Sequence, residues 1–143
     1  MYAFVRSDLY GLDPVDFFND ETLSLTELNK RKVILFTGIA NPDDLIEFIQ
    51  TKTLQPEILK YPDHYNYTAN DLHQLRDKIL KHKGDNGVLL TTEKDYCRLK
   101  FSQYLPELNN LPVYYLPMEV RIGPKETFEK LILEYVEQNK RDR

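Results

Sequence analysis

The sequence predicts an α/β fold of three layers, in which helices cover both faces of a mostly parallel sheet of about four to five strands. Short apolar runs rich in β-branched and aromatic residues recur at 33–37, 56–61, 87–91 and 113–117. Stretches with the apolar spacing of helices separate these runs, as parallel strands require, because a tight hairpin loop joins only antiparallel neighbours. We therefore expect a Rossmann-like arrangement whose binding loops follow the carboxyl ends of the strands.

The first strand and helix are predicted from residue 33 onward. The run VILFT at 33–37 is too short for a helix and has the composition of a buried strand. Asn41 is expected to cap the helix that follows, and Pro42 suits its first turn, where a missing N–H is no loss. Asp43 and Asp44 then lie at the positive end of the helix dipole.

The second unit begins with PEILKY at 56–61, which predicts a short strand. Thr68 and Asp71 have the spacing of a capping box and predict a helix start. The apolar residues behind them recur at helical spacing; they are Leu72, Leu75, Ile79 and Leu80. We expect this helix to end near Lys83, with Gly84 as its stop signal.

The third strand is predicted by GVLLT at 87–91. Thr92 and Asp95 repeat the capping-box spacing and open a short helix that should run to about Lys100. A fourth strand follows at 113–117, the run VYYLP.

The end of the chain is predicted to add a final helix, whereas its beginning departs from the strand–helix alternation. Pro124 is expected to start a final helix, because proline suits the first helical turn. Residues 1–30 do not follow the strand–helix alternation: residues 1–12 have strand character, residues 13–20 resemble a loop, and SLTELN predicts a turn or short helix.

Composition narrows the function classes. With 143 residues, 41% of them hydrophobic and 29% charged, the chain suits one soluble globular domain. The formal charge of −4 and the scattered basic residues argue against a nucleic-acid groove. No apolar run approaches the roughly 20 residues of a bilayer span, and no signal-peptide pattern opens the chain.

The histidines and the cysteine predict no metal site. Cys97 is the single cysteine, so an internal disulfide is excluded and a reducing compartment is consistent with it. His73 and His82 are nine residues apart, a spacing that places them on opposite faces of a helix. Cys97 also has no histidine near it in sequence, which argues against a nucleophilic thiol.

Common nucleotide and hydrolase motifs are absent from the sequence. Neither the phosphate-binding loop GxxxxGK[ST] nor the dinucleotide pattern GxGxxG occurs, and there is no GxSxG elbow. Three loops are instead expected at the carboxyl edge of the sheet, namely GIANP, PDHYNYT and TTEKD.

Each of these loops has a functional and a purely structural interpretation. Asn41 with the following helix start could face an anion, or simply form a turn. Lys94 could meet a phosphate and Thr92 a phosphate or Mg²⁺, or the two could belong to a capping box with solvated charges. His64 suits proton transfer near neutral pH, or it is a half-buried loop histidine. Asp63 and His64 need not touch, because neighbours in an extended segment point to opposite faces.

The stretches LFTGIANP (35–42), YPDHYNYT (61–68) and LLTTEKD (89–95), in this order and spacing, resemble the C-terminal half of the tetraacyldisaccharide 4'-kinases. These enzymes use ATP to phosphorylate the 4' hydroxyl of tetraacyldisaccharide 1-phosphate in lipid A biosynthesis. The resemblance spans about residues 30–120 and includes VYYLPMEV at 113–120, while residues 1–12 look like the linker between the two halves of such kinases.

The resemblance implies that the two halves of such a kinase have different roles. The family's N-terminal P-loop domain holds the Walker lysine, the Mg²⁺ ligands and an aspartate base, none of which is found here. We expect residues 31–143 to form the C-terminal α/β domain and residues 1–30 the interdomain linker strand and loop, as a fragment inactive alone. ATP and Mg²⁺ would bind mainly to the absent P-loop domain, with no cofactor on this chain.

The resemblance also implies partners and a location. The chain would work with the P-loop domain and with the lipid A precursor disaccharide. The full protein would lie at the cytoplasmic face of the bacterial inner membrane and touch the membrane surface through the missing half. This chain by itself is expected to be soluble.

The resemblance implies site residues as well. His64 would assist the aspartate base of the absent domain, and Asp63 would orient it. Contacts with substrate or nucleotide would involve the remaining motif positions, Asn41, Thr92, Glu93, Lys94 and Asp95. Two positions depart from the family pattern: Tyr65 stands where a second histidine is common, and Tyr96 where alanine is common.

The alternative function is a stand-alone α/β module that binds phosphate or sugar nucleotides without catalysis. The strand predicted near residues 1–12 would lack a partner, so we expect disorder or self-association there, because unpaired strand edges pair with other chains.

Overall fold

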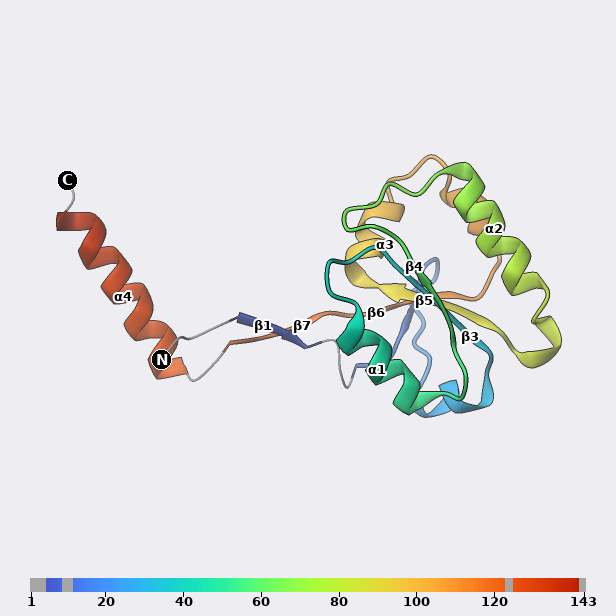
Figure 1. The fold of residues 1–143 in the computed structure, drawn as a ribbon, viewed down its shortest axis with the longest axis horizontal. Helices are drawn as coiled ribbons and strands as arrows, with labels where there is room; N and C mark the ends of the chain where they lie inside the picture. Colours follow the sequence, from blue (N-terminus) through green and yellow to red (C-terminus); the bar gives the residue numbers. More distant parts are fainter. Residues whose placement is uncertain (1–4, 9–11, 123–124, 142–143) are drawn as a thin grey trace. The chain divides into compact units, whose positions relative to one another are not determined.

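The computed structural model describes residues 5–8, 12–122 and 125–141. It contains two compact units, which are described separately below. The larger unit is formed by the central part of the chain, up to Pro117, and the smaller one by segments from the two ends. Figure 1 labels the four α-helices and most of the strands.

The larger unit is built on a five-stranded sheet in the order β2-β6-β5-β3-β4. Its strands are β2 (Val15–Asp16), β3 (Val33–Thr37), β4 (Glu57–Lys60), β5 (Val88–Thr92) and β6 (Val113–Leu116). β3 pairs in parallel with β4 and β5, β5 pairs in parallel with β6, and the short β2 runs antiparallel to β6. The predicted mostly parallel α/β sheet is confirmed.

Helices cover both faces of this sheet. They are α1 (Asp43–Lys52), α2 (Ala69–Leu80) and α3 (Glu93–Leu99), joined by the 3₁₀ turns η1 (Leu25–Lys30), η2 (Lys83–Asp85) and η3 (Leu105–Leu108). One core forms where α2, α3 and η3 pack on alternate residues of the strands, such as Ile34 and Phe36. A second core forms where α1 and η1 pack on the intervening residues, such as Val33 and Leu35. Figure 1 shows α2 and α3 on one side of the sheet and α1 on the other, which confirms the three layers.

Residues 15–30 contribute to the larger unit. β2 lies in the sheet, and Phe17, Leu23 and Leu28 are buried in its two cores. The domain division expected at residue 30 stays a prediction, although the sheet and core include residues on both sides of it.

Two helix ends differ from expectation. Asn41 does not cap α1: the N-cap is Pro42, whose carbonyl accepts the N–H of Ile46, so the helical hydrogen bonds begin one residue later. α2 ends at Leu80 rather than near Lys83, because the backbone tightens into 3₁₀ turns there. The left-handed residue that ends this segment is Asn86, with φ 50°, and not Gly84.

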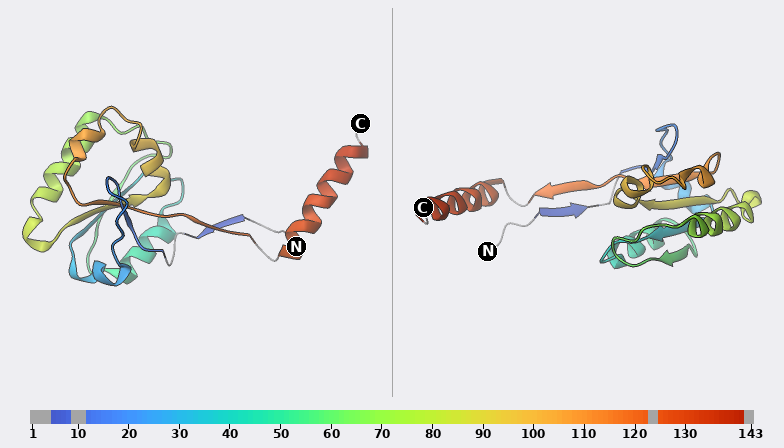
Figure 2. Two further views of the ribbon diagram at one scale, coloured as in Figure 1. Left: turned by 180° about the vertical axis from the view of Figure 1, so that it is seen from behind. Right: turned by 90° about the horizontal axis from the view of Figure 1, so that it is seen from above.

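The smaller unit pairs β1 (Val5–Asp8) with β7 (Glu119–Ile122) in an antiparallel ribbon and adds α4 (Lys125–Arg141). The two strands run in opposite directions in Figure 2, right. The expectation of a partnerless strand near residues 1–12 is therefore wrong for residues 5–8. Residues 1–4 and 9–11, and the predicted helix start at Pro124, lie outside the described residues.

The final helix is confirmed as α4. Several of its apolar side chains are exposed, including Leu133 and Tyr135. Within the described part of the chain, every helix falls short of the length and apolarity that a bilayer crossing requires.

Candidate functional site

The loop YPDHYNYT follows β4 and lies against the carboxyl end of β3. The backbone N–H of Tyr61 donates to the carbonyl of Thr37 at 2.9 Å, and the N–H of His64 donates to the carbonyl of Gly38 at 3.2 Å. A side chain at position 38 would not fit, because a Cβ there would lie 2.9 Å from the Pro62 carbonyl oxygen and 3.2 Å from the Tyr65 Cβ. The glycine therefore lets two predicted loops approach each other closely.

Three tyrosines hold this loop to the core. The rings of Tyr61, Tyr65 and Tyr67 pack on one another with centroids 5.0–5.3 Å apart, and Tyr67 meets Phe36 of β3 edge-on at 5.7 Å. Burial raises the pKa of Tyr61 to about 12, with smaller contributions from the Asp71 charge and from Tyr65. The Tyr61 hydroxyl consequently stays protonated over the whole physiological range.

Asp95 joins all three predicted loops through a fully buried carboxylate. Its Oδ2 accepts the hydroxyl protons of Thr37 at 2.8 Å and Thr92 at 2.6 Å. Its Oδ1 accepts the backbone N–H of Gly38 at 3.0 Å and the hydroxyl of Tyr67 at 3.1 Å. Four donors from three stretches of the chain therefore converge on one side chain, as a buried carboxylate requires.

The second capping box is only half present. The Thr92 hydroxyl accepts the backbone N–H of Asp95 at 3.1 Å, as predicted, and Thr92 is the N-cap of α3. The Asp95 carboxylate does not complete the box, since its contacts are to side chains and to Gly38. Burial raises the pKa of Tyr67 well above its usual value, and the charge and hydrogen bond of Asp95 add to this, so Tyr67 remains a donor.

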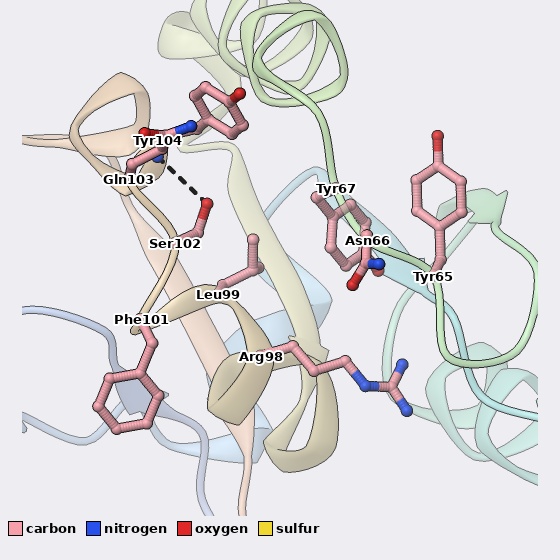
Figure 3. A pocket seen from close by; sticks show the side chains of 9 residues that line it. All are labelled: Tyr65, Asn66, Tyr67, Arg98, Leu99, Phe101, Ser102, Gln103 and Tyr104. Carbon is pink, nitrogen blue, oxygen red and sulfur yellow. Dashed lines mark hydrogen bonds between the residues drawn. The ribbon is translucent and has the colours of Figure 1, made fainter.

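Arg98 connects this buried cluster to His64. Its Nη1 donates to the carbonyl of Gly38 at 3.0 Å and lies 3.8 Å from Asp95 Oδ1. Its Nη2 lies 3.0 Å from His64 Nδ1. Figure 3 shows the side chain reaching from α3 toward the loop that carries Tyr65 and Tyr67. Sequence reasoning missed Arg98, although its position three residues after Asp95 on a helix was a usable signal.

His64 is exposed and lies beside Asp63. Its backbone has φ 56°, in the left-handed region, so the segment is not extended here. The two side chains therefore do not point to opposite faces: His64 Nε2 lies 3.6 Å from Asp63 Oδ2. The half-buried loop histidine is also not what the structure contains, because the His64 side chain is 82% exposed.

The other predicted site residues lie in the same loops with different exposure. Asn41 and Lys94 are exposed, Glu93 is half-buried, and Thr92 and Asp95 are buried. Contacts of these residues with nucleotide or substrate stay a prediction. For Thr92 and Asp95, burial places them beneath the surface that a ligand would reach.

The oxygen atoms of Thr92 and Asp95 do not suit a magnesium ion. The Thr92 hydroxyl and both Asp95 oxygens are already committed to each other and to neighbours. Elsewhere in the described ranges, no group of three or more acidic, histidine or cysteine side chains could hold a metal.

A pocket of about 280 Å³ opens beside Arg98. Its lining includes Asn66 and Tyr67 from the loop and Ser102 and Tyr104 from the segment after α3 (Figure 3). The Ser102 hydroxyl accepts the backbone N–H of Tyr104 at 3.1 Å, which fixes that segment. Polar and aromatic groups thus line a hollow next to Arg98, which contacts His64.

The capping box at the start of α2 is complete and gives a pH-dependent prediction. Asp71 accepts the backbone N–H of Thr68 at 2.8 Å, the Thr68 hydroxyl at 2.9 Å and the Tyr65 hydroxyl at 2.9 Å. Desolvation alone would raise the pKa of Asp71, but these hydrogen bonds outweigh it and lower the pKa. The stabilisation is therefore present at neutral pH and is lost as the pH falls through the lowered pKa.

We expect Asp71→Ala to reduce the free energy of unfolding by about 0.5–2 kcal/mol at pH 7, the usual effect of a lost cap. The difference from the wild-type chain should shrink below about pH 4, where the Asp71 carboxyl of the unfolded chain becomes protonated. Urea unfolding of both chains at pH 7 and pH 3 measures it. A difference of equal size at both pH values would show that the Asp71 charge contributes nothing.

Comparison with known proteins identifies relatives of this chain. Residues 6–137 match the family model described as tetraacyldisaccharide-1-P 4'-kinase. The tetraacyldisaccharide 4'-kinase of Bacteroides thetaiotaomicron is 33% identical over 122 residues, which are 84% of this chain and 32% of that protein. The Phocaeicola vulgatus relative of the same name is 34% identical over 137 residues, 93% of this chain and 37% of that protein.

A solved structure is also similar. LpxK from Aquifex aeolicus, crystallised in complex with ATP, has 20% sequence identity and a TM-score of 0.47 over 92% of this chain and 35% of that chain. The chain spans about a third of the length of the curated relatives it matches. Because the family model covers nearly all of its residues, the chain belongs to the tetraacyldisaccharide-1-P 4'-kinase family.

Proposed function

We propose that this chain supplies the C-terminal part of an ATP-dependent kinase that phosphorylates the 4' hydroxyl of tetraacyldisaccharide 1-phosphate in lipid A biosynthesis. Family membership supports the activity, and the share of the relatives that the chain covers supports a partial contribution. The absence of GxxxxGK[ST] from these 143 residues agrees with ATP and Mg²⁺ binding on the part of the kinase that this chain does not cover.

The observation that carries the proposal is the placement of His64. An exposed imidazole sits at the carboxyl edge of a parallel sheet, where ligands of such sheets collect. A buried network fixes the loop behind it, so the imidazole is held in place while remaining accessible. In the assembled kinase His64 assists the aspartate base of the other domain, and Asp63, 3.6 Å away, helps to orient it.

The kinase reaction depends on the positioning of the reacting groups more than on covalent catalysis by the protein. Phosphoryl transfer is catalysed chiefly by aligning the reacting oxygens and stabilising their charge. This chain would close over the reacting groups together with its partner domain and exclude water, as hinged domains do. The assembled kinase would work at the cytoplasmic face of the bacterial inner membrane and meet the membrane through the part outside this chain.

A chimera tests the proposal. The segment of the Bacteroides thetaiotaomicron kinase that matches this chain is replaced by residues 1–143, and phosphate transfer from ATP to tetraacyldisaccharide 1-phosphate is measured. We expect turnover from the chimera and none from residues 1–143 alone. The unmodified relative and the relative lacking the segment are the two controls.

Two outcomes would contradict the proposal. A folded chimera without activity would remove the claim that this chain can complete a kinase, and turnover by residues 1–143 alone would remove the claim that it needs a partner. Calorimetry adds a separate check: micromolar binding of ATP or a phosphosugar to residues 1–143 alone would favour a stand-alone binding module.

A further inference from the structure

The Arg98 guanidinium determines which nitrogen of His64 can carry a proton. A guanidinium group has only donors and is always charged, so in the contact of 3.0 Å with His64 Nδ1 the arginine must donate. Nδ1 is therefore the acceptor. A neutral imidazole has one N–H, so in this arrangement it lies on Nε2.

The backbone brings His64 to this position. His64 has a left-handed φ of 56°, and its backbone N–H is held by the Gly38 carbonyl at 3.2 Å. The same carbonyl accepts Arg98 Nη1 at 3.0 Å. One carbonyl thus positions both partners of the Arg98–His64 contact, which fixes their relative geometry.

Asp95 also lies close to the guanidinium. The carboxylate lies 3.8 Å from Arg98 Nη1 and is itself fixed by Thr37, Thr92 and Tyr67. An arginine side chain loses considerable rotamer freedom when it is ordered, and a rigid buried anion offsets that cost. The arginine is consequently held in place before any ligand arrives.

The opposite nitrogen of His64 remains accessible. Nε2 lies 3.6 Å from Asp63 Oδ2, which is longer than a hydrogen bond, and the His64 ring is largely exposed. An N–H at Nε2 can therefore be donated to a carboxylate on another domain. That is the geometry of a group that orients and stabilises a base.

We propose that Arg98 is a positioning residue of the kinase: by donating to Nδ1 it keeps the neutral His64 as the Nε2–H tautomer, so that His64 acts as a donor to the catalytic base. The catalytic part of this statement rests on the function proposed above. The tautomer itself is a property of residues 1–143 and can be measured without any kinase activity.

Nitrogen-15 NMR of the histidine rings in residues 1–143, at a pH where the imidazoles are neutral, tests the tautomer. The wild-type chain should show a protonated Nε2 and an acceptor Nδ1 at His64. Arg98→Ala should convert His64 to a mixture of both tautomers, and added guanidinium ion at non-denaturing concentration should restore the original signature. His73 and His82, which contact other partners, serve as internal references.

Two matched variants complete the NMR test. Arg76→Ala removes an exposed arginine from α2 and should leave the His64 signals unchanged. Arg98→Lys keeps the charge without the planar fork and should restore the tautomer only in part, and it replaces Arg98→Ala if that variant does not fold. An unchanged His64 tautomer in a folded Arg98 variant would overturn the inference.

The chimera then tests the catalytic consequence. We expect Arg98→Ala to lower kcat by about 100-fold, the order of loss that misplaced catalytic groups cause, with partial recovery on adding guanidinium ion. The KM for ATP should change much less. A wild-type kcat in the Arg98→Ala chimera would overturn the positioning role, whereas an inactive wild-type chimera would count against the proposed function and leave the NMR result to decide the tautomer.

Discussion

Replacing Asp95 by alanine is expected to lower the free energy of unfolding by about 3–5 kcal/mol, the range observed when one partner of a buried charged cluster is removed. The change leaves the hydroxyls of Thr37, Thr92 and Tyr67 and the backbone N–H of Gly38 without their acceptor. Each unsatisfied buried group costs about 1–3 kcal/mol, although such losses do not add fully. Urea unfolding followed by circular dichroism measures the effect.

Two further variants serve as comparisons for Asp95→Ala. Asp95→Asn keeps the shape but turns an NH₂ group toward donors that cannot all reorient, so we expect a smaller loss than for alanine. Asp77→Ala removes an exposed aspartate from α2 and should change stability by less than about 0.5 kcal/mol. A loss below about 1 kcal/mol for Asp95→Ala would show that the three loops are held together without it.

His64→Ala in the chimera is expected to lower kcat by about 10²–10⁴-fold, the usual contribution of a group that takes part in proton transfer. The KM for ATP should change little, because the exposed imidazole is assigned to the base and not to the nucleotide. Initial rates at saturating lipid and ATP measure this, with His73→Ala, an exposed histidine of α2, as the matched control. A kcat equal to that of the control would remove His64 from the mechanism.

The strands and their order of appearance could be predicted because each buried strand is a short, nearly continuous apolar run. Val33 to Thr37 and Val88 to Thr92 are buried at every position, as strands covered on both faces must be. The complete capping box of Thr68 and Asp71 was predictable for a similar reason, since both partners lie within one turn of helix.

The hydrogen bonds that the Asp95 carboxylate accepts from other loops could not be predicted from local spacing. Its partners Thr37 and Gly38 are 58 and 57 residues away in sequence, and only the parallel pairing of β3 and β5 brings them near. A capping-box pattern therefore identified the residue but not its main role. Arg98 and His64, 34 residues apart, meet because β4, which precedes the His64 loop, pairs with β3 on the side opposite β5.

The backbone conformation of single residues could not be predicted from the sequence either. Nothing in the pattern around His64 shows that a non-glycine residue adopts φ 56°, and the expectation of an extended segment led to the wrong side-chain directions. The pairing of β1 with β7 was missed because the two four-residue strands lie at opposite ends of the chain. Long-range pairing of short strands leaves little trace in sequence.

The most direct test of the central claim, that this chain presents His64 to the reacting groups of a kinase, is the paramagnetic broadening of histidine NMR signals in the chimera. With Mn²⁺ and ADP bound in place of the natural metal and nucleotide, the His64 ring signals should broaden strongly. Those of His82 should stay sharp, because His82 precedes β5 and lies toward the opposite edge of the sheet. Sharp His64 signals in an active, nucleotide-saturated chimera would contradict the account.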